Sequence, residues 1–243
     1  MSDALELFRQ QWATYRTVVS HDLMEHAALS RATAAALQGW LASRSPGAPA
    51  PQLVDLGCGD LALLAPLLRQ LPLVRYTGLD LTASVLPLAA AQLGEVPYPT
   101  HWLCGDLLGW ALGELPADPN PGPVELIHTS FAVHHLGDAD KRRWLEGCRR
   151  RIAPGGLLLW ADVFRPPGEA LEAYRQRYST RIRQGWPQLS SLQQEQVIEH
   201  LSANDQPADG AAIAMAAAEC GWRWRWAWRG QHQAEALAVL EPA

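Results

Sequence analysis

The residues with the clearest chemistry stand where a strand is expected to end. Asp55 closes the strand-like run 53–56, and Gly57 and Gly59 follow in a tight turn. Glycine is needed where the backbone takes a positive φ or where a ligand lies against the main chain. Gly57-x-Gly59-x-x-Ala62 matches the dinucleotide fingerprint. However, Asp55 would repel a pyrophosphate, and the nearby Pro66 disturbs the helix that would cradle one.

Two further carboxylates are expected beside this turn. Asp80 ends the next predicted strand, 23 residues after Gly57, and Asp106 follows the third. At that distance a carboxylate can accept hydrogen bonds from both hydroxyls of a ribose. We expect Asp55, Asp80 and Asp106 to lie side by side on one sheet edge. Such an anionic rim suits a ligand with ribose, amino groups and a fixed positive charge, and it does not suit a phosphate.

Alternating strands and helices are predicted to position these residues. The predicted strands cover residues 53–56, 75–80, 100–104, 124–130 and 157–163, and the helices between them cover 61–71, 84–93 and 141–152. Short alternation of this kind indicates a parallel sheet with helices on both faces. The flanking segments are a helical stretch 4–44, a breaker-rich linker 45–51, a polar helical stretch 168–206, a helix 211–220 capped by Gly221, and closing strands 222–229 and 234–241.

Composition narrows the classes of function. Hydrophobic residues make up 48% of the 243, and 20 Lys and Arg stand against 25 Asp and Glu, so the net charge is −5. A net negative chain of this kind is a poor candidate for nucleic-acid binding.

The four cysteines are widely spaced and suggest neither disulfides nor a zinc knuckle. No secretory signal or membrane span is visible, which predicts a cytoplasmic protein without a membrane partner. The oligomeric state stays open.

Five motifs in order resemble those of the class I S-adenosylmethionine-dependent methyltransferases. They are VDLGCGD (54–60), YTGLD (76–80), CGDL (104–107), VELIHTSFAVHHL (124–136) and IAPGGLLLWADV (152–163). The resemblance implies a Rossmann-like α/β fold with a seven-stranded, mostly parallel sheet whose last strand is antiparallel. It also implies four parts: an N-terminal helical arm or lid (1–45), a cofactor-binding core (50–165), a helical cap insertion (166–207), and the last helix with the closing strands (208–243).

The resemblance assigns the cofactor S-adenosylmethionine to the predicted sheet edge. The glycine loop would receive the methionine half, Asp80 the ribose and Asp106 the adenine amino group. The full expected set is Asp55, Gly57, Cys58, Gly59, Asp80, Leu81, Asp106, Leu107, Thr129 and Ser130. For Asp55 and Asp106 the alternative is a structural role, orienting the loop or capping a helix. One residue departs from the family pattern, because Leu61 stands where a third glycine is usual.

Methyl transfer is an in-line displacement that needs alignment and exclusion of water, and a base only if the acceptor arrives protonated. His134 and His135 follow the fourth predicted strand and are candidate bases, with a buried, loop-shaping histidine as the alternative. Asp162 ends the fifth strand and could orient an amine or hydroxyl, or cap a loop. These three residues are the predicted catalytic set.

The resemblance also implies that the arm folds over the cofactor, where it could contact the cofactor or the methyl acceptor, and that the cap forms part of the acceptor pocket. The candidate residues are Tyr15, His21, His26, Tyr178 and Trp186. A metal site at His21 and His26 is the alternative for the arm. These two residues are five apart and lie on different helix faces, so no metal is predicted.

A tryptophan-rich segment closes the sequence. Trp222, Trp224, Trp226 and Trp228 alternate with arginines and one alanine, which on a strand puts four indoles on one face. Stacking on nucleic-acid bases is one interpretation. The net charge favours the other, a closing strand that buries its indoles.

Together these observations predict S-adenosylmethionine-dependent methylation of a small molecule. The alternatives are a catalytically silent S-adenosylmethionine-binding or regulatory protein of the same fold, and a nicotinamide oxidoreductase. A protein side chain or peptide stays open as the acceptor.

Overall fold

A computed structural model describes residues 13–116, 118–119 and 122–243. Seven strands form one continuous sheet in the order β3-β2-β1-β4-β5-β8-β7. Their bounds are β1 Gln52–Leu56, β2 Arg75–Asp80, β3 Thr100–Cys104, β4 Val124–Ser130, β5 Ile152–Arg165, β7 Trp222–Arg229 and β8 Glu235–Pro242. The first five are parallel, and β8 runs antiparallel to both β5 and β7. The predicted fold is therefore confirmed.

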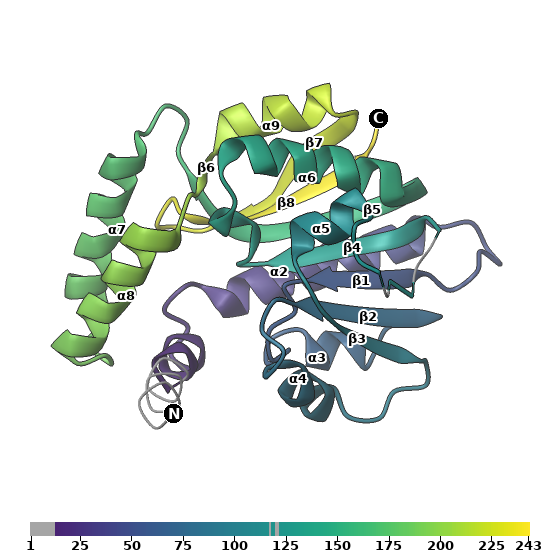
Figure 1. Cartoon of the computed structure of the whole chain (residues 1–243), viewed down its shortest axis with the longest axis horizontal. Coiled ribbons are helices and arrows are strands. Elements are labelled where there is room, and N and C mark those ends of the chain that lie inside the picture. The colour runs from purple at the N-terminus through teal and green to yellow at the C-terminus, as the bar shows by residue number, and fades with distance from the viewer. Residues whose placement is uncertain (1–12, 117, 120–121) are drawn as a thin grey trace.

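Helices cover both faces of the sheet (Figure 1). One face carries α2 (His26–Ser43), α3 (Ala65–Leu68) and α4 (Leu86–Leu93). The other carries α5 (Leu107–Leu112), α6 (Asp138–Arg151) and α9 (Gly210–Glu219). The central strands are buried on both sides, as expected of near-continuous apolar runs in a parallel sheet.

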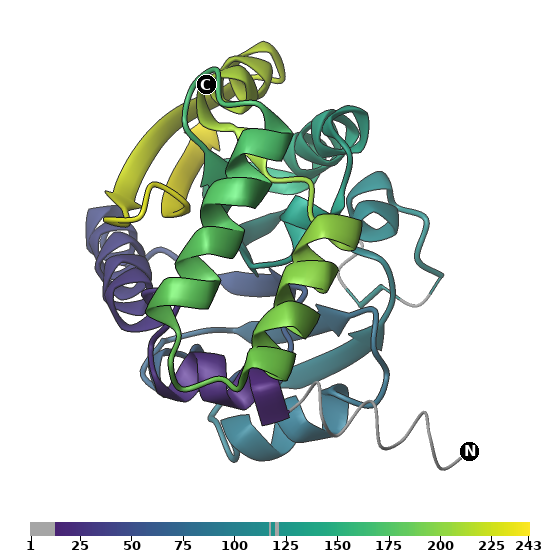
Figure 2. The same cartoon turned by 90° about the vertical axis from the view of Figure 1, so that its left-hand side faces the viewer.

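The predicted cap is a pair of helices beyond one end of the sheet. They are α7 (Leu171–Gly185) and α8 (Ser191–Asn204), and Figure 2 shows them side by side in front of the sheet. A third apolar cluster joins them to the arm, since Val18 and Leu23 pack with Tyr178 and Ile182. Residues 13–20 of the arm are helical, and the predicted helix over residues 4–12 lies outside the described residues. The four-part division of the chain stays a prediction.

Three expectations about individual elements were wrong. The structure adds a two-residue strand, β6 (Ala208–Asp209), which pairs with the end of β5. The predicted helix 61–71 shrinks to α3, because residues 62–64 form turns and Pro66 occupies the first helical turn. The helix α5, which we did not predict, begins directly after Asp106.

The four indoles of β7 do not share one face. The register against β8 shifts between Trp226 and Trp228, where Ala227 is the extra residue of a bulge. Trp224 and Trp226 pack on the cluster beneath α6 and α9, whereas Trp228 packs on the cluster of the opposite face. The predicted burial of indoles on a closing strand holds for Trp222, which is 2% exposed and donates to the Leu145 carbonyl.

Among the described residues, no helix is both long enough and apolar enough to cross a membrane.

Candidate active site

The loop after β1 is held against the end of β2 by its backbone. The amides of Gly57 and Cys58 both donate to the Leu79 carbonyl, at 2.8 and 2.9 Å. Gly57 has φ of +75° and Gly59 has φ of +54°, which is the left-handed region that glycine adopts without strain. A Cβ on Gly57 would lie 2.5 Å from the Ala132 Cβ, so this position also needs glycine for space.

The departure from the family pattern at Leu61 leaves the loop geometry intact. Leu61 has φ of +60°, the left-handed conformation that a third glycine would take without strain. Its side chain is 3% exposed and packs in the cluster beneath α2 and α3. Burial of this side chain offsets the strain of its backbone.

Asp80 closes the loop and also faces the cavity described below. Its Oδ2 accepts from the Gly59 amide at 2.9 Å, and its Oδ1 accepts from the Thr82 amide at 2.8 Å. The carboxylate is half-buried in the cavity wall. Both oxygens keep a lone pair for further donors, such as the hydroxyls of a ribose.

The other two aspartates have clear structural partners. Asp106 caps α5, where its side chain accepts from the Gly109 amide at 2.8 Å. Asp55 is 2% exposed, accepts from the Tyr76 hydroxyl at 3.0 Å and lies 2.7 Å from His128 Nδ1. Burial and the Asp55 charge raise the pKa of Tyr76 well above its ordinary value, so the phenol stays the donor. The structural alternatives are therefore realised, although both residues also border the cavity.

One cavity of about 1290 Å³ connects the glycine loop to the cap. Its wall is built by the arm, the loops after β1, β2, β3 and β4, and the helices α7 and α8. It is lined by fifteen of the eighteen predicted site residues, namely Tyr15, His26, Asp55, Gly57, Cys58, Gly59, Asp80, Leu81, Asp106, Leu107, Ser130, His134, His135, Tyr178 and Trp186.

Thr129, Asp162 and His21 are not among the residues that line the cavity. Thr129 donates from Oγ1 to the Leu56 carbonyl and so fastens β4 to β1. His21 is exposed and is hydrogen-bonded within its own turn, to the Thr17 carbonyl. Their predicted contacts with cofactor and acceptor stay predictions, without direct support from this arrangement.

Asp162 does not line the cavity, but it contacts His134, which does. Its carboxylate is fully buried and lies 2.6 Å from His134 Nδ1, and it also accepts from the His134 amide and Trp160 Nε1. Burial opposes ionisation of Asp162, but the nearby His134 holds the pKa of the carboxyl below its ordinary value. Burial would lower the pKa of His134, yet Asp162 outweighs it and raises this pKa. These contacts fix the ring of His134, and the predicted catalytic role of Asp162 stays a prediction.

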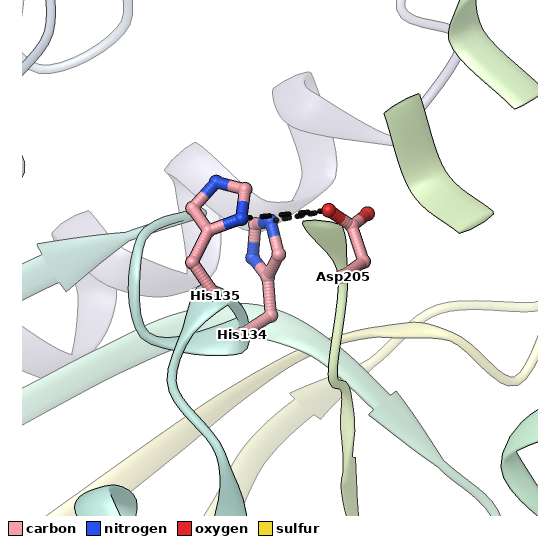
Figure 3. Close-up of side chains that lie close together, drawn as sticks. All are labelled: His134, His135 and Asp205. Carbon is pink, nitrogen blue, oxygen red and sulfur yellow. Dashed lines mark ion pairs between the residues drawn. The ribbon is translucent and has the colours of Figure 1, made fainter. Parts of the chain in front are cut away.

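The pKa of His135 is shifted in the opposite direction to that of His134. Partial burial, followed by repulsion from His134, lowers the pKa of His135 to about 4, so this imidazole is neutral at neutral pH. Asp205, just after α8, lies opposite both rings (Figure 3). Burial raises the pKa of the Asp205 carboxyl. Sequence reasoning missed Asp205, because nothing in the polar segment 168–206 marks it among the other hydrophilic residues.

The arm and the cap close the cavity from the other side. Partial burial and then the Asp60 carboxylate raise the pKa of Tyr15, which lies near the glycine loop. His26 is 4% exposed and packs edge-on against Phe131, with ring centroids 5.4 Å apart. Tyr178 donates to Glu235 Oε1 at 2.7 Å, and Trp186 is buried beside it. The arrangement leaves a partly open chamber between the loop and α7–α8.

Comparison with known proteins shows a similarity to methyltransferases over the central part of the chain. Residues 54–158 match the family described as a methyltransferase domain. The trans-aconitate 2-methyltransferase of Azoarcus sp. (strain BH72) is 34% identical over 118 residues, which cover 49% of this chain and 41% of that protein. Residues 54–158 are therefore similar to a methyltransferase domain, in agreement with the motifs of the sequence.

Solved structures share the fold. The N-methyltransferase NodS from Bradyrhizobium japonicum WM9 has a TM-score of 0.53 at 15% identity, covering 90% of this chain and 94% of that one. Human N-acetylserotonin methyltransferase in complex with SAM has a TM-score of 0.50 at 17% identity, covering 79% and 48%. The chain spans about half the length of the curated relatives it matches, between 41% and 50%.

The similarity to a methyltransferase domain agrees with the predicted cofactor, S-adenosylmethionine, and so does the charge of the cavity. Among the described residues that line the cavity, Arg31 is the one lysine or arginine, and it is exposed on α2. The acidic lining residues are Asp55, Asp60, Asp80, Asp106, Glu199 and Asp205. A wall of this charge favours a sulfonium cation and disfavours a diphosphate.

Proposed function

We propose that the chain transfers the methyl group of S-adenosylmethionine to a small molecule held between the glycine loop and the α7–α8 cap. The observation that carries this proposal is the cavity of about 1290 Å³ that runs from Asp80 to Asp205. A drug-sized ligand needs about 300–1,000 Å³. The cavity therefore has room for the cofactor and a second small molecule, which favours an enzyme over a silent cofactor-binding protein.

In this proposal the loop of Gly57 and Gly59 holds the methionine half and Asp80 the ribose. The cofactor supplies the methyl group on a good leaving group, so the residues of the chain mainly align the acceptor and exclude water. The arm and the cap do both, through Tyr15, Tyr178 and Trp186. His134 and His135 face the acceptor end, and Asp162 fixes the orientation of His134.

Two measurements test the proposal. Calorimetry with S-adenosylhomocysteine and with NAD compares the two cofactor classes, and we expect binding of the first alone. Methyl-labelled S-adenosylmethionine is then incubated with the protein and a cell extract, and the extract is separated into small-molecule, protein and nucleic-acid fractions. We expect label in the small-molecule fraction, and less of it at limiting cofactor when Asp80→Ala replaces the wild type.

Each other outcome overturns a stated part of the proposal. Label in the protein or nucleic-acid fraction would exclude a small-molecule acceptor. Cofactor binding without label in any fraction would favour the silent binding protein. Tight binding of NAD would favour an oxidoreductase.

A further inference from the structure

Three potential metal ligands converge at the cap end of the cavity, from segments far apart in the chain. His134 and His135 belong to the short helix η1 (Val133–His135) after β4, and Asp205 follows α8 (Figure 3). One ligand atom from each lies within 4.8 Å of the others. Asp205 Oδ1 lies 3.6 Å from His134 Nε2 and 3.5 Å from His135 Nδ1.

Asp205 Oδ1 is buried and has no hydrogen-bond partner among the described residues. A buried carboxylate oxygen without a hydrogen bond is costly, and the imidazoles 3.5–3.8 Å away are too distant to donate one, so a cation between them and Oδ1 would satisfy this atom. Around a tetrahedral zinc ion, with bonds near 2.1 Å, neighbouring ligand atoms are about 3.4 Å apart. The two distances from Asp205 to the imidazoles are close to this spacing, whereas they are long for hydrogen bonds.

His134 is oriented as a metal-binding histidine. Its Nδ1 lies 2.6 Å from the buried Asp162 carboxylate, so Nδ1 keeps its proton there and Nε2 is the nitrogen that can offer a lone pair to a metal. Nε2 is the atom that faces Asp205. Metal-bound histidines commonly donate their other ring N–H to a carboxylate, which fixes the tautomer and the ring orientation.

Hydrogen bonds to backbone carbonyls hold the segment of His134 and His135 against the segment of Asp205. The Gln206 amide donates to the His134 carbonyl at 2.7 Å. The buried Lys141 donates from Nζ to the carbonyls of both Leu136 and Gln206. These bonds fix Asp205 opposite the two imidazoles without any metal, so the site is preorganised.

We propose that His134, His135 and Asp205 bind one divalent transition-metal ion, such as Zn²⁺, Co²⁺ or Fe²⁺. Two imidazoles and one carboxylate suit these ions, whereas Mg²⁺ and Ca²⁺ prefer oxygen ligands. His135 is exposed and all three residues line the cavity, so the remaining coordination positions face the acceptor chamber. His200, whose Nε2 lies 3.8 Å from Asp205 Oδ1, is within reach of one of them.

Metal binding by these three residues does not depend on methyl transfer. The use of the ion in catalysis does rest on the proposed function: an acceptor with an oxygen or nitrogen donor would occupy an open coordination position beside the cofactor. Coordination uses the lone pair of each imidazole, so with metal bound neither histidine serves as the base.

Titration of the chelator-treated protein with Co²⁺ tests the site. We expect visible absorption bands of a low-symmetry Co²⁺ site that saturate at one ion per chain and disappear when Zn²⁺ is added. Equilibrium dialysis with Zn²⁺ gives the affinity, and Mg²⁺ and Ca²⁺ should not compete at equal concentration. Asp205→Asn and His135→Ala should each abolish the Co²⁺ bands. Asp162→Asn should weaken Zn²⁺ binding by about 10- to 100-fold through His134.

Controls keep the result independent of folding and of the proposed function. His232→Ala, at an exposed histidine outside the cavity, should bind Co²⁺ as the wild type does. Every variant is also tested for S-adenosylhomocysteine binding, which reports an intact core. Absence of Co²⁺ binding by the wild type, or unchanged binding by Asp205→Asn, would overturn the metal site. Metal binding without cofactor binding would support the site and contradict the proposed function.

Discussion

The Gly59 amide donates a 2.9 Å hydrogen bond to Asp80 Oδ2, so the carboxylate at the end of β2 fixes the glycine loop after β1. The other oxygen of the same carboxylate accepts from the Thr82 amide. Asp80 therefore has two tasks, since it shapes the loop on one side and presents lone pairs to the cavity on the other.

The first prediction concerns this double role. Asp80→Ala should weaken binding of S-adenosylhomocysteine by roughly 1–3 kcal/mol, because it removes charge-assisted hydrogen bonds to the ribose and frees the loop. Calorimetry measures the change. Asp140→Ala, at a half-buried position of α6 outside the cavity, is the matched control and should bind as the wild type does. Equal affinities for Asp80→Ala and the control would refute the ribose role.

The second prediction separates space from backbone strain at the two loop glycines. Gly57→Ala places a Cβ 2.5 Å from the Ala132 Cβ at φ of +75°, whereas Gly59→Ala meets no atom within 4 Å at φ of +54°. Gly59→Ala should cost about 1–2 kcal/mol of unfolding free energy from conformation alone. Gly57→Ala should cost a further 1–3 kcal/mol or so from overpacking, and should lose cofactor binding.

Removal of the opposing methyl group is the control for the glycine series. In Gly57→Ala/Ala132→Gly the overpacking is relieved, so stability should return to about that of Gly59→Ala. Chemical denaturation of the three variants measures this. If the double variant is no more stable than Gly57→Ala, contact with Ala132 is not the reason for glycine at this position.

The fold was predictable because its signals are local. Apolar runs that end in Asp55, Asp80 and Asp162 mark parallel strands, and parallel strands must bring such ends to one edge. The predicted cofactor residues could be grouped from the sequence because they stand at the carboxyl ends of these strands. The cofactor-binding, catalytic and acceptor roles of the individual residues stay predictions.

Other features depend on contacts that no local pattern encodes. The bulge at Ala227 is set by the register of β7 against β8, so strict alternation misplaced Trp228. The left-handed backbone at Leu61 is maintained by burial of its side chain in a cluster that also gathers residues of α2 and α4. Asp205 faces His134 because Lys141 and Gln206 tie two segments together across the fold. Tertiary packing decides each of these cases.

The third prediction concerns the attachment of the cap. Glu235 on β8 is 1% exposed, accepts from the Tyr178 hydroxyl at 2.7 Å and pairs with Arg181 at 2.7 and 2.9 Å. Arg181 also donates to the Leu23 carbonyl of the arm at 2.7 Å. Glu235→Ala leaves Arg181 without its counter-charge, which should cost about 3–5 kcal/mol and loosen α7. Chemical denaturation measures the cost, and limited proteolysis should cleave the cap faster.

The matched control is a second ion pair of the cap, between Arg183 and Glu195, which is exposed to solvent on both sides. Glu195→Ala should leave unfolding and proteolysis nearly unchanged, because exposed pairs contribute little. Similar losses in Glu195→Ala and Glu235→Ala would show that burial of the pair is not what secures the cap.

The fourth prediction is a pH dependence of stability that originates at His26. Burial lowers the pKa of His26 to about 4, from 6.5 in the unfolded chain. Above pH 6.5 both states are neutral and its contribution is fully present. As the pH falls toward 4 the unfolded chain takes up the proton first, so the free energy of unfolding falls, by about 2 kcal/mol between pH 7.5 and 5. Chemical denaturation of the wild type and His26→Phe across this range should show that the free energy of unfolding of the variant falls by about 2 kcal/mol less.

His232→Phe, at an exposed position, is the control and should follow the wild type. Parallel curves for the wild type and His26→Phe would contradict the assignment to His26.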